Sequence, residues 1–534
     1  MFDLKFVNAR IVDGTGNPWF RADVGIEDGR ITALEPRLGG DARRTIDVQD
    51  RVIAPGFIDL HSHADFTLPQ HPSAASVVSQ GVTTQLLGNC GFSPFPVHDE
   101  RVELLRDASA FLDDGLPWGR WRDLAGYVAH LASKSIVPNV ALQVGHGALR
   151  ISAMGFEPRP PEPAELAVMQ EELARALSEG AVGISTGLTY TPGSYAETDE
   201  LVALAEVVAG FGGFYSSHIR GEGYTLIQGV EEALEVGRRA GVPVQLSHHK
   251  AMGRDNWEKI DTTLGLLDEA RAAGQDVLAD QYPYTAGSTT LAVLLPRWVM
   301  ERGIEGAQAL LSDPSVYRRV REQIARQSPE DLRKGQREFY PDDVVVADAP
   351  AELARYIGST LTEVAQQRGE EAVDTALYLL RVGGGAVLTI VYGMSDANVE
   401  KIMAHPAVAV ASDGWTLSPD AGGRPHPRSF GTFPRVLGRY VREKSVLRLE
   451  DAIRKMTSLP AQRIGLRDRG IVGLGGIADL VVLDPDLVID RATFETPDAF
   501  PDGISGVVIN GRVVLEDGVS SEERPGRFLR RAAA

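Results

Sequence analysis

Residues 55–63 read Pro55-Gly56-Phe57-Ile58-Asp59-Leu60-His61-Ser62-His63, an apolar run that ends in two histidines separated by one residue. Side chains alternate between the two faces of a β-strand, so His61 and His63 are expected to point the same way. Two neutral imidazoles on one face at a strand end can bind a divalent metal ion. The ordinary alternative is a pair of histidines at a polar strand end, and this motif alone does not decide between them.

The middle of the chain alternates between strand-like and helix-like segments. Helical patterns include residues 164–178, which end at Gly180, and residues 225–240, which end at Gly241. Eight such units favour a TIM-like (β/α)8 barrel. A doubly wound open sheet is the alternative, although no Gly-rich phosphate-binding motif follows the first strand. The expected strands are 57–63, 82–89, 138–145, 181–187, 213–219, 242–249, 276–282 and 407–412.

The two ends of the chain and one internal segment depart from this alternation. Residues 1–54 and 470–534 contain short apolar alternations broken by turns, such as the hairpin signal Asn510-Gly511. We therefore expect one small β-sandwich domain built from both ends, and a catalytic barrel at 55–469.

Residues 288–345, which follow the seventh strand, form a long, charged and helix-prone segment. They are predicted to form an inserted lid over the active site, with a surface excursion that has no catalytic part as the alternative.

The composition limits the classes of partner. Of the 534 residues 43% are hydrophobic and 24% charged, as in globular proteins. The formal net charge of −19 disfavours nucleic acid and anionic membranes as partners. No apolar run approaches the ~20 residues of a membrane span, and the start of the chain lacks a signal-peptide core. Cys90 is the only cysteine, so no intrachain disulfide can form, and a cytoplasmic location is expected. The oligomeric state is left open.

Residues that can bind a metal stand at the ends of further predicted strands. Cys90 follows the second strand, His218 ends the fifth, His248 and His249 end the sixth, and Asp413 ends the eighth. Each of them alone is more readily a structural residue; a lone cysteine, for example, is usually a small buried hydrophobe. Together with the histidines of the first strand they would share one rim of the barrel. This convergence points to a metal site, and thiolate with imidazole ligands favours zinc.

Several motifs resemble a known family. The run from Ala54 to His63 is similar to the amidohydrolase superfamily, and so is Gly476-Ile477-Ala478-Asp479-Leu480-Val481-Val482-Leu483-Asp484-Pro485. Within that superfamily the chain closely resembles the N-acyl-D-amino-acid deacylases (D-aminoacylases) over nearly its whole length. The motifs are Gly88-Asn89-Cys90-Gly91, Gly187-Leu188-Thr189-Tyr190-Thr191-Pro192-Gly193, Ser247-His248-His249-Lys250 and His426-Pro427-Arg428.

The resemblance implies which matching residues bind metal. Zinc would be held tightly by Cys90, His218 and His248. A second, weaker metal position would lie between the two histidines of the first strand and Asp413, where Cys90 can bridge. Strand alternation also favours His248 over its neighbour His249, which would point to the other face. Residues 183–187 contain no lysine, which disfavours the relatives that bridge two metal ions with a carboxylated lysine.

The resemblance also implies the reaction. Asp413 would accept the proton of a water molecule and pass it to the leaving amine, in the zinc-dependent hydrolysis of N-acyl-D-amino acids to a carboxylate and a free D-amino acid. The substrate carboxylate would be bound by Lys250, Tyr282, Ser288 and Arg428.

The side-chain preference and the activity class have alternatives. No basic residue stands out for an acidic side chain, although Arg150 or Arg220 could reach one, so neutral, hydrophobic side chains are expected. The alternative functions are another amidohydrolase-type amide hydrolase, such as a dipeptidase or a cyclic-amide hydrolase, and a catalytically inactive scaffold relative.

Overall fold

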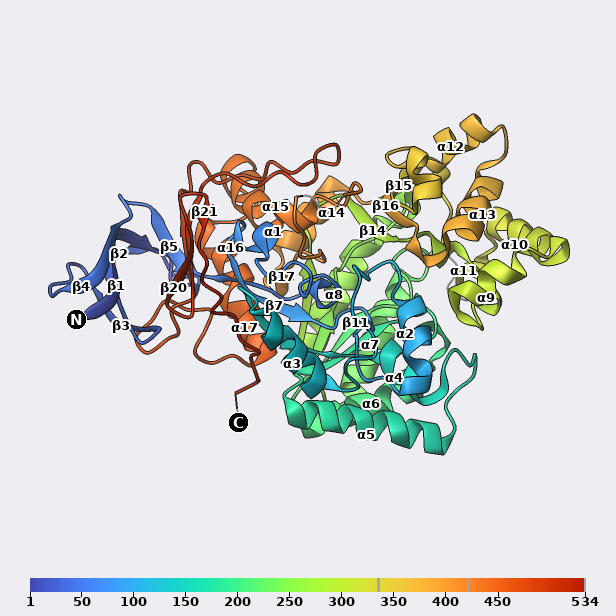
Figure 1. Ribbon diagram of the computed structural model, residues 1–534, viewed down its shortest axis with the longest axis horizontal. Helices are drawn as coiled ribbons and strands as arrows, with labels where there is room; N and C mark the ends of the chain where they lie inside the picture. Colours follow the sequence, from blue (N-terminus) through green and yellow to red (C-terminus); the bar gives the residue numbers. More distant parts are fainter. Residues whose placement is uncertain (334–336, 420–421, 533–534) are drawn as a thin grey trace.

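A parallel β-barrel forms the centre of the computed structural model, which describes residues 1–333, 337–419 and 422–532 (Figure 1). One row of strands runs β6-β7-β8 and a second runs from β9 to β17, and a parallel bridge between Ser62 and Gly414 joins them. The predicted barrel is confirmed, and the open sheet is wrong. The strands are β6 (Phe57–Asp59), β7 (Val82–Leu87), β8 (Asn139–Leu142) and its continuation β9 (Val144–Gly145), β10 (Gly183–Gly187), β11 (Phe214–His218), β12 (Val244–Leu246), β13 (Val277–Gln281) and β17 (Val408–Val410).

Helices surround the barrel and begin and end where the sequence provides caps. In α5 (Pro163–Glu179), Glu162 and Glu165 form a capping box, and Gly180 ends the helix in a left-handed conformation. The helices outside the insertion described below are α1 (Ala75–Val78), α2 (Val102–Ala108), α3 (Leu124–Lys134), α4 (His146–Met154), α5, α6 (Thr198–Gly210), α7 (Leu226–Ala240), α8 (Lys259–Ala272), α14 (Asp396–Ala404), α15 (Arg428–Arg435), α16 (Leu449–Met456) and α17 (Ser458–Ile464).

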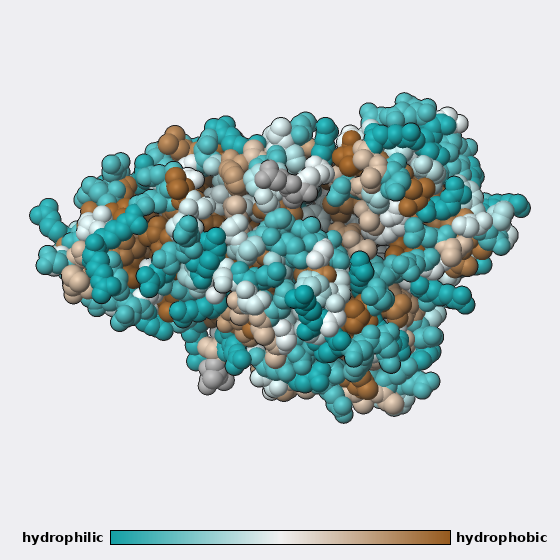
Figure 2. Space-filling model, in the orientation of Figure 1, coloured by the Kyte–Doolittle hydropathy of each residue, from teal (hydrophilic) through white to brown (hydrophobic). Residues whose placement is uncertain are grey.

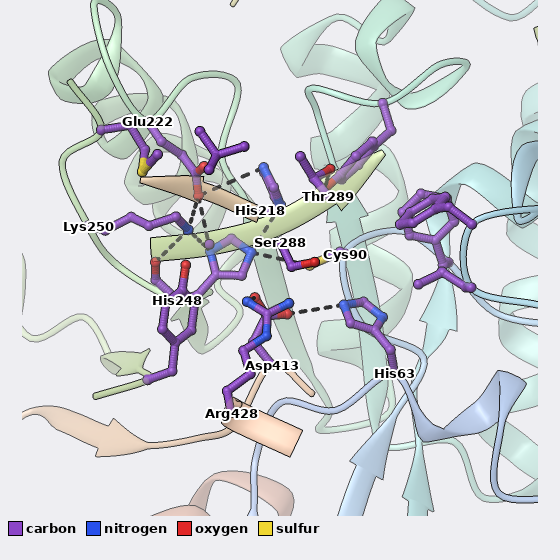
Figure 3. Close-up of a pocket in the computed structure, with 18 of the residues that line it drawn as sticks. His63, Cys90, His218, Glu222, His248, Lys250, Ser288, Thr289, Asp413 and Arg428 are labelled. Atoms are coloured by element: carbon purple, nitrogen blue, oxygen red, sulfur yellow. Dashed lines mark hydrogen bonds and ion pairs between the residues drawn. The ribbon is translucent and has the colours of Figure 1, made fainter. Parts of the chain in front are cut away.

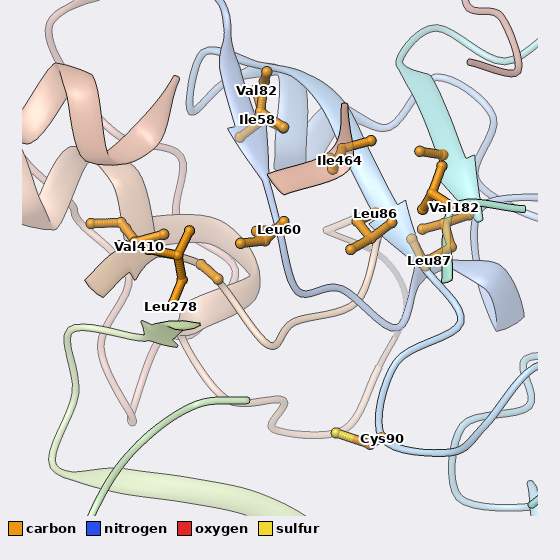
Figure 4. Close-up of a cluster of buried hydrophobic side chains, with 14 of the residues drawn as sticks. Ile58, Leu60, Val82, Leu86, Leu87, Cys90, Val182, Leu278, Val410 and Ile464 are labelled. Atoms are coloured by element: carbon orange, nitrogen blue, oxygen red, sulfur yellow. The ribbon is translucent and has the colours of Figure 1, made fainter. Parts of the chain in front are cut away.

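Aliphatic side chains from the barrel strands and the surrounding helices make up the largest core. Figure 4 shows Ile58, Leu86, Val182 and Val410 within it, all buried. Burial of each such side chain contributes roughly 1.5–3 kcal/mol, so this core holds the strand ends in fixed positions. Cys90 is a buried member of the same cluster, and in this view it lies at the edge of the side chains drawn. It follows the end of β7, at the rim of the barrel.

The first and last segments of the chain form one nine-stranded sheet, at the left of Figure 1. The antiparallel pairing of β5 with β18 joins the two chain ends. Asn510 and Gly511 connect β19 to β20 with φ values of 51° and 77°, as the hairpin signal predicts. The strands are β1 (Phe2–Ile11), β2 (Phe20–Glu27), β3 (Arg30–Glu35), β4 (Ala42–Asp47), β5 (Val52–Pro55), β18 (Leu480–Leu483), β19 (Ile504–Ile509), β20 (Arg512–Glu516) and β21 (Val519–Ser520).

An inserted unit lies between β13 and β17, at the right of Figure 1. It is longer than the expected 288–345: β14 pairs with β16, and one hydrophobic core runs from Leu291 to Val387. The predicted end therefore cuts through β15, in the middle of a sheet; residues 334–336 lie outside the described residues. The unit contains β14 (Ala286–Thr290), α9 (Gly303–Leu310), α10 (Pro314–Arg326), α11 (Pro329–Arg333), β15 (Val344–Asp348), α12 (Leu361–Arg368), α13 (Ala372–Gly383) and β16 (Leu388–Tyr392).

One face of the molecule is predominantly polar. The face in Figure 2 is mostly hydrophilic, with hydrophobic residues in separate small groups. Among the described helices, none combines the length and the apolar character that crossing a membrane requires.

Candidate metal centre

A thiol and imidazoles meet at one end of the barrel. The Sγ of Cys90 lies 3.3 Å from Nε2 of His248, which lies 3.0 Å from Nδ1 of His218 (Figure 3). All three side chains are buried. Burial lowers the pKa of His218 to about 4, so this imidazole is neutral near pH 7, the form that binds metal. One sulfur and two nitrogen atoms this close together fit a zinc-type site.

A second group of donors adjoins the first. Nε2 of His61 lies 3.2 Å from the Cys90 sulfur and 3.3 Å from Oδ1 of Asp413, and Nε2 of His63 lies 3.2 Å from the same carboxylate oxygen. His61, Cys90, His248 and Asp413 each offer a ligand atom within 4.8 Å of the others. Cys90 is thus in contact with both groups, which is the arrangement that a bridging ligand requires.

Charge interactions favour the ionised forms of Cys90 and Asp413. Burial alone would raise the pKa of the Cys90 thiol, but His61 and His248 outweigh burial and hold that pKa well below its ordinary value. Burial likewise opposes ionisation of Asp413, whereas Arg428, His248 and His61 together hold its pKa well below the usual range. Both groups can therefore act as anions at neutral pH.

The backbone is unusual at three of these positions. Cys90, His248 and Asp413 have φ values of 53°, 36° and 51°. This left-handed region is uncommon for residues with a side chain, and such conformations persist where the surrounding structure holds them, often at functional sites. Next to Cys90, a Cβ atom added to Gly187 would lie 2.0 Å from the Cys90 carbonyl oxygen. The end of β10 therefore has no room for a lysine.

The structure separates the two adjacent histidines. His248 faces the donors described above, whereas Nε2 of His249 lies 2.9 Å from Oγ1 of Thr263 on α8. We expect His248→Ala to weaken zinc binding by ~10²–10⁴-fold, since it would remove one of the predicted ligands. His249→Ala should retain zinc and lose only about 0.5–1.5 kcal/mol of stability with the lost hydrogen bond. Elemental analysis of both purified variants checks this, and the reverse order of zinc loss would contradict it.

The predicted carboxylate-binding residues border the same cavity, which has an empty volume of about 530 Å³. The ring of Tyr282 lies near two cations, with the Arg428 guanidinium 4.9 Å and the Lys250 ammonium 5.5 Å from its centre. Oγ of Ser288 and Nε of Arg428 are buried and have no hydrogen-bond partner among the described residues. Unused buried donors need an acceptor, so the cavity is suited to an anionic ligand.

Three neighbouring residues were not found by the sequence analysis. Asp280 on β13 places Oδ1 3.1 Å from Nδ1 of His61, and Glu222 contacts Lys250. Arg337, from the insertion, lies 3.3 Å from Nε2 of His218. A charged residue directly after the apolar run Val277-Leu278-Ala279 in the predicted strand 276–282 is a signal that could have found Asp280. Glu222 and Arg337 reach the site through the conformations of loops, and no pattern in the sequence predicts those conformations.

The two arginines that the sequence left as possible partners of an acidic side chain are paired elsewhere. Arg150 pairs with Glu200 at 2.5 Å, and Arg220 pairs with Glu232 at 2.9 Å. Neither arginine borders the cavity at the metal donors. Each already has a carboxylate partner, so these two residues are not free to bind an acidic substrate side chain.

Comparison with known proteins agrees with this architecture. The model of the amidohydrolase family matches residues 44–515. The N-acyl-D-glutamate deacylase of Alcaligenes xylosoxydans xylosoxydans is 40% identical, with 100% of this chain and 97% of the relative covered, and the D-aminoacylase of the same organism is 36% identical, with 100% and 98% covered. The crystal structure of the N-acyl-D-glutamate deacylase from Bordetella bronchiseptica, complexed with zinc and a phosphonate inhibitor that mimics the tetrahedral intermediate, superimposes with a TM-score of 0.84 at 36% identity over 99% of both chains. This chain belongs to the amidohydrolase family.

Proposed function

We propose that the protein is a zinc-dependent deacylase that hydrolyses N-acyl-D-amino acids to a carboxylate and a free D-amino acid. The observation that carries the proposal is the cysteine between two groups of metal donors, beside a cavity that contains Lys250 and Arg428. The full-length relatives named N-acyl-D-glutamate deacylase and D-aminoacylase support it. A cytoplasmic location stays a prediction from the single cysteine.

The donor groups assign the metal positions in this proposal. Cys90, His218 and His248 would hold the tightly bound zinc ion, and His61, His63 and Asp413 would frame a weaker second position. When bound, zinc supplies Lewis-acid chemistry that activates water and polarises an amide carbonyl.

Asp413 is proposed to carry the proton. Its Oδ2 accepts a hydrogen bond from Nη1 of Arg428 at 2.7 Å, which leaves Oδ1 facing the histidines of the first strand. An ionised carboxylate whose second oxygen points toward the metal donors can take a proton from the attacking water and later give it to the leaving nitrogen. Arg428 also fixes the orientation of that carboxylate.

The remaining residues would hold the substrate. Lys250 and Arg428 supply positive charge, and the hydroxyls of Tyr282 and Ser288 supply hydrogen bonds, to the substrate α-carboxylate. The insertion contributes Ser288 and Arg337 to the cavity wall. We therefore propose that it covers the bound substrate and excludes water, as a lid does.

Arg428→Ala tests the carboxylate contact. A hydrogen bond to a charged group contributes ~1.5–3 kcal/mol, so kcat/KM for an N-acetyl-D-amino acid should fall roughly 10–150-fold while zinc stays bound. Steady-state kinetics and elemental analysis measure the two effects. Arg435→Ala is the matched control, because Arg435 lies at the other end of α15 and pairs with Asp490 outside the cavity.

The substrate itself gives an independent check of that contact. An N-acyl amine that lacks the carboxylate should be a poor substrate of the wild type. If it were hydrolysed as fast as the N-acyl amino acid, Arg428 would have no role in recognition.

Two classes of side chain are candidates for the amino acid. Neutral, hydrophobic side chains fit the aromatic wall formed by Phe92, Phe111 and Tyr190. These three residues also border an adjacent cavity of about 640 Å³, which contains Arg297. The Nε of Arg297 is buried without a hydrogen-bond partner in the described parts of the chain, and this favours a second candidate, N-acyl-D-glutamate. The relative named N-acyl-D-glutamate deacylase supports that candidate.

One substrate panel tests the proposal and ranks the two classes. The zinc-loaded protein is assayed with N-acetyl-D-leucine, N-acetyl-D-glutamate and N-acetyl-L-leucine, together with a dipeptide and a dihydropyrimidine. Hydrolysis of either D-compound above the L-compound supports the proposal, and the better D-compound identifies the side-chain class. Preference for the L-compound, the dipeptide or the cyclic amide would overturn it.

A further inference from the structure

One buried carboxylate, Glu222, touches three functional side chains of the site. It lies four residues after His218 in the loop that follows β11, and it is 5% exposed. Its Oε1 lies 3.1 Å from Nδ1 of His248 and contacts the ammonium of Lys250 (Figure 3). Its Oε2 lies 3.4 Å from Nη1 of Arg337. No step of the proposed mechanism uses it.

We propose that Glu222 is a positioning residue that orients the metal ligand His248, the substrate-binding Lys250 and Arg337 of the insertion through one carboxylate. This inference rests on the proposed zinc-dependent deacylase function. It adds a residue that would act through others and would touch neither the metal nor the reacting atoms.

The two nitrogens of His248 face different partners. Nε2 faces Cys90 and His218, and Nδ1 faces Glu222. An imidazole that binds a metal through Nε2 carries its proton on Nδ1, and a carboxylate that accepts this proton fixes the tautomer and the ring orientation. Glu222 is the carboxylate within hydrogen-bond reach of that nitrogen. Removing its charge should therefore weaken metal binding without removing a ligand.

The same carboxylate balances positive charge brought from two other segments. Nζ of Lys250 lies 2.9 Å from Nδ1 of His248 and contacts Glu222, so an ammonium already lies against both of these side chains. For this reason we assign the neighbouring set His218, Glu222 and His248 to charge pairing and not to a further metal site. Arg337 reaches the same carboxylate from the insertion. Glu222 thus connects the barrel rim to the segment proposed to cover it.

Glu222→Gln tests the role, because it keeps the shape and removes the charge. The zinc Kd, measured by competition with a chromogenic chelator, should rise about 10–100-fold, the usual cost of losing a carboxylate behind a metal-binding histidine. The KM for the best N-acetyl-D-amino acid of the panel should rise about tenfold or more, since Lys250 loses its charged partner.

Glu200→Gln is the matched control. Glu200 is also 5% exposed and bonds one histidine and one cation, His146 at 2.8 Å and Arg150 at 2.5 Å, but it does not border the metal cavity. Both variants should lower the thermal midpoint, whereas only Glu222→Gln should change the zinc Kd. An unchanged zinc Kd and KM in folded Glu222→Gln would overturn the proposal.

Glu222→Asp covers the case in which the glutamine variant does not fold. Aspartate keeps the charge but withdraws it by one methylene, so the zinc Kd should rise above the values of the wild type and Glu200→Gln, by less than the ~10–100-fold expected on full loss of the charge. Wild-type values for both the zinc Kd and the KM in this variant would also overturn the inference. Wild-type protein that binds no zinc would overturn the proposed function, and the inference with it.

Discussion

Replacement of Cys90 by alanine should remove zinc and activity together. Cys90 contacts both groups of donors, 3.2 Å from His61 and 3.3 Å from His248, and its pKa is held below the ordinary value because these imidazoles outweigh burial. A zinc site of ~10–16 kcal/mol that loses one of three protein ligands should lose about a third of that energy, and thus ~10²–10⁴-fold in affinity. The measurements are zinc per chain by elemental analysis and kcat/KM on the preferred N-acetyl-D-amino acid.

Cys90→Ser separates ligation from packing. Serine fills nearly the same volume, but its hydroxyl stays protonated and is a poor zinc ligand. If Cys90→Ala and Cys90→Ser lose zinc equally, the loss comes from the missing thiolate and not from the cavity that the smaller alanine side chain leaves. About one zinc ion retained per chain in Cys90→Ala would show that Cys90 is not a primary ligand.

The barrel could be predicted because its determinants are local. Each strand is a short, buried segment with apolar residues in it, and turn residues such as Gly180 and Gly241 end the helices between them in left-handed conformations. The extent of the insertion could not be predicted, because pairing of β14 with β16 joins residues about one hundred positions apart. Prediction from short stretches of sequence cannot detect pairing between strands so far apart in the chain.

The choice of His248 shows a different limit. Strand alternation favours His248 over His249, but β12 ends at Leu246 and His248 has a φ of 36°. The backbone turn after the strand, and not the alternation within it, directs His248 toward Cys90. Its backbone N–H donates to Oδ1 of Asp280 at 2.7 Å. Asp280 thus helps to hold a conformation that the residue pattern around His248 does not reveal.

Arginine assignments were the least predictable part of the site. Arg428 stands in a His-Pro-Arg motif and borders the cavity as expected. Arg150 and Arg220, in contrast, are paired with Glu200 and Glu232, and Arg337 enters the cavity wall from the insertion. Long side chains take their partners from tertiary structure, so charge alone does not show which cation is available to a ligand.

Asp413→Asn should reduce turnover and leave zinc in place. The asparagine amide is nearly isosteric with the carboxylate but cannot accept a proton as a base, and the proposed tight ligands Cys90, His218 and His248 are untouched. General acid–base catalysis contributes ~10²–10⁴-fold, so kcat should fall by that factor while zinc stays near the wild-type content.

Asp413 forms a buried ion pair with Arg428, so the variant Asp413→Asn requires a control for the loss of that pair. Breaking a buried pair destabilises a protein by several kcal/mol on its own, about 3–5 in typical cases. Asp479→Asn breaks a comparable buried pair with Arg469, away from the metal cavity. Both variants should have a lower thermal midpoint, but only Asp413→Asn should lose kcat in the temperature range where both are folded. Near-normal turnover in folded Asp413→Asn would remove Asp413 from the mechanism, because no other carboxylate among the described residues lies within 3.3 Å of both His61 Nε2 and His63 Nε2.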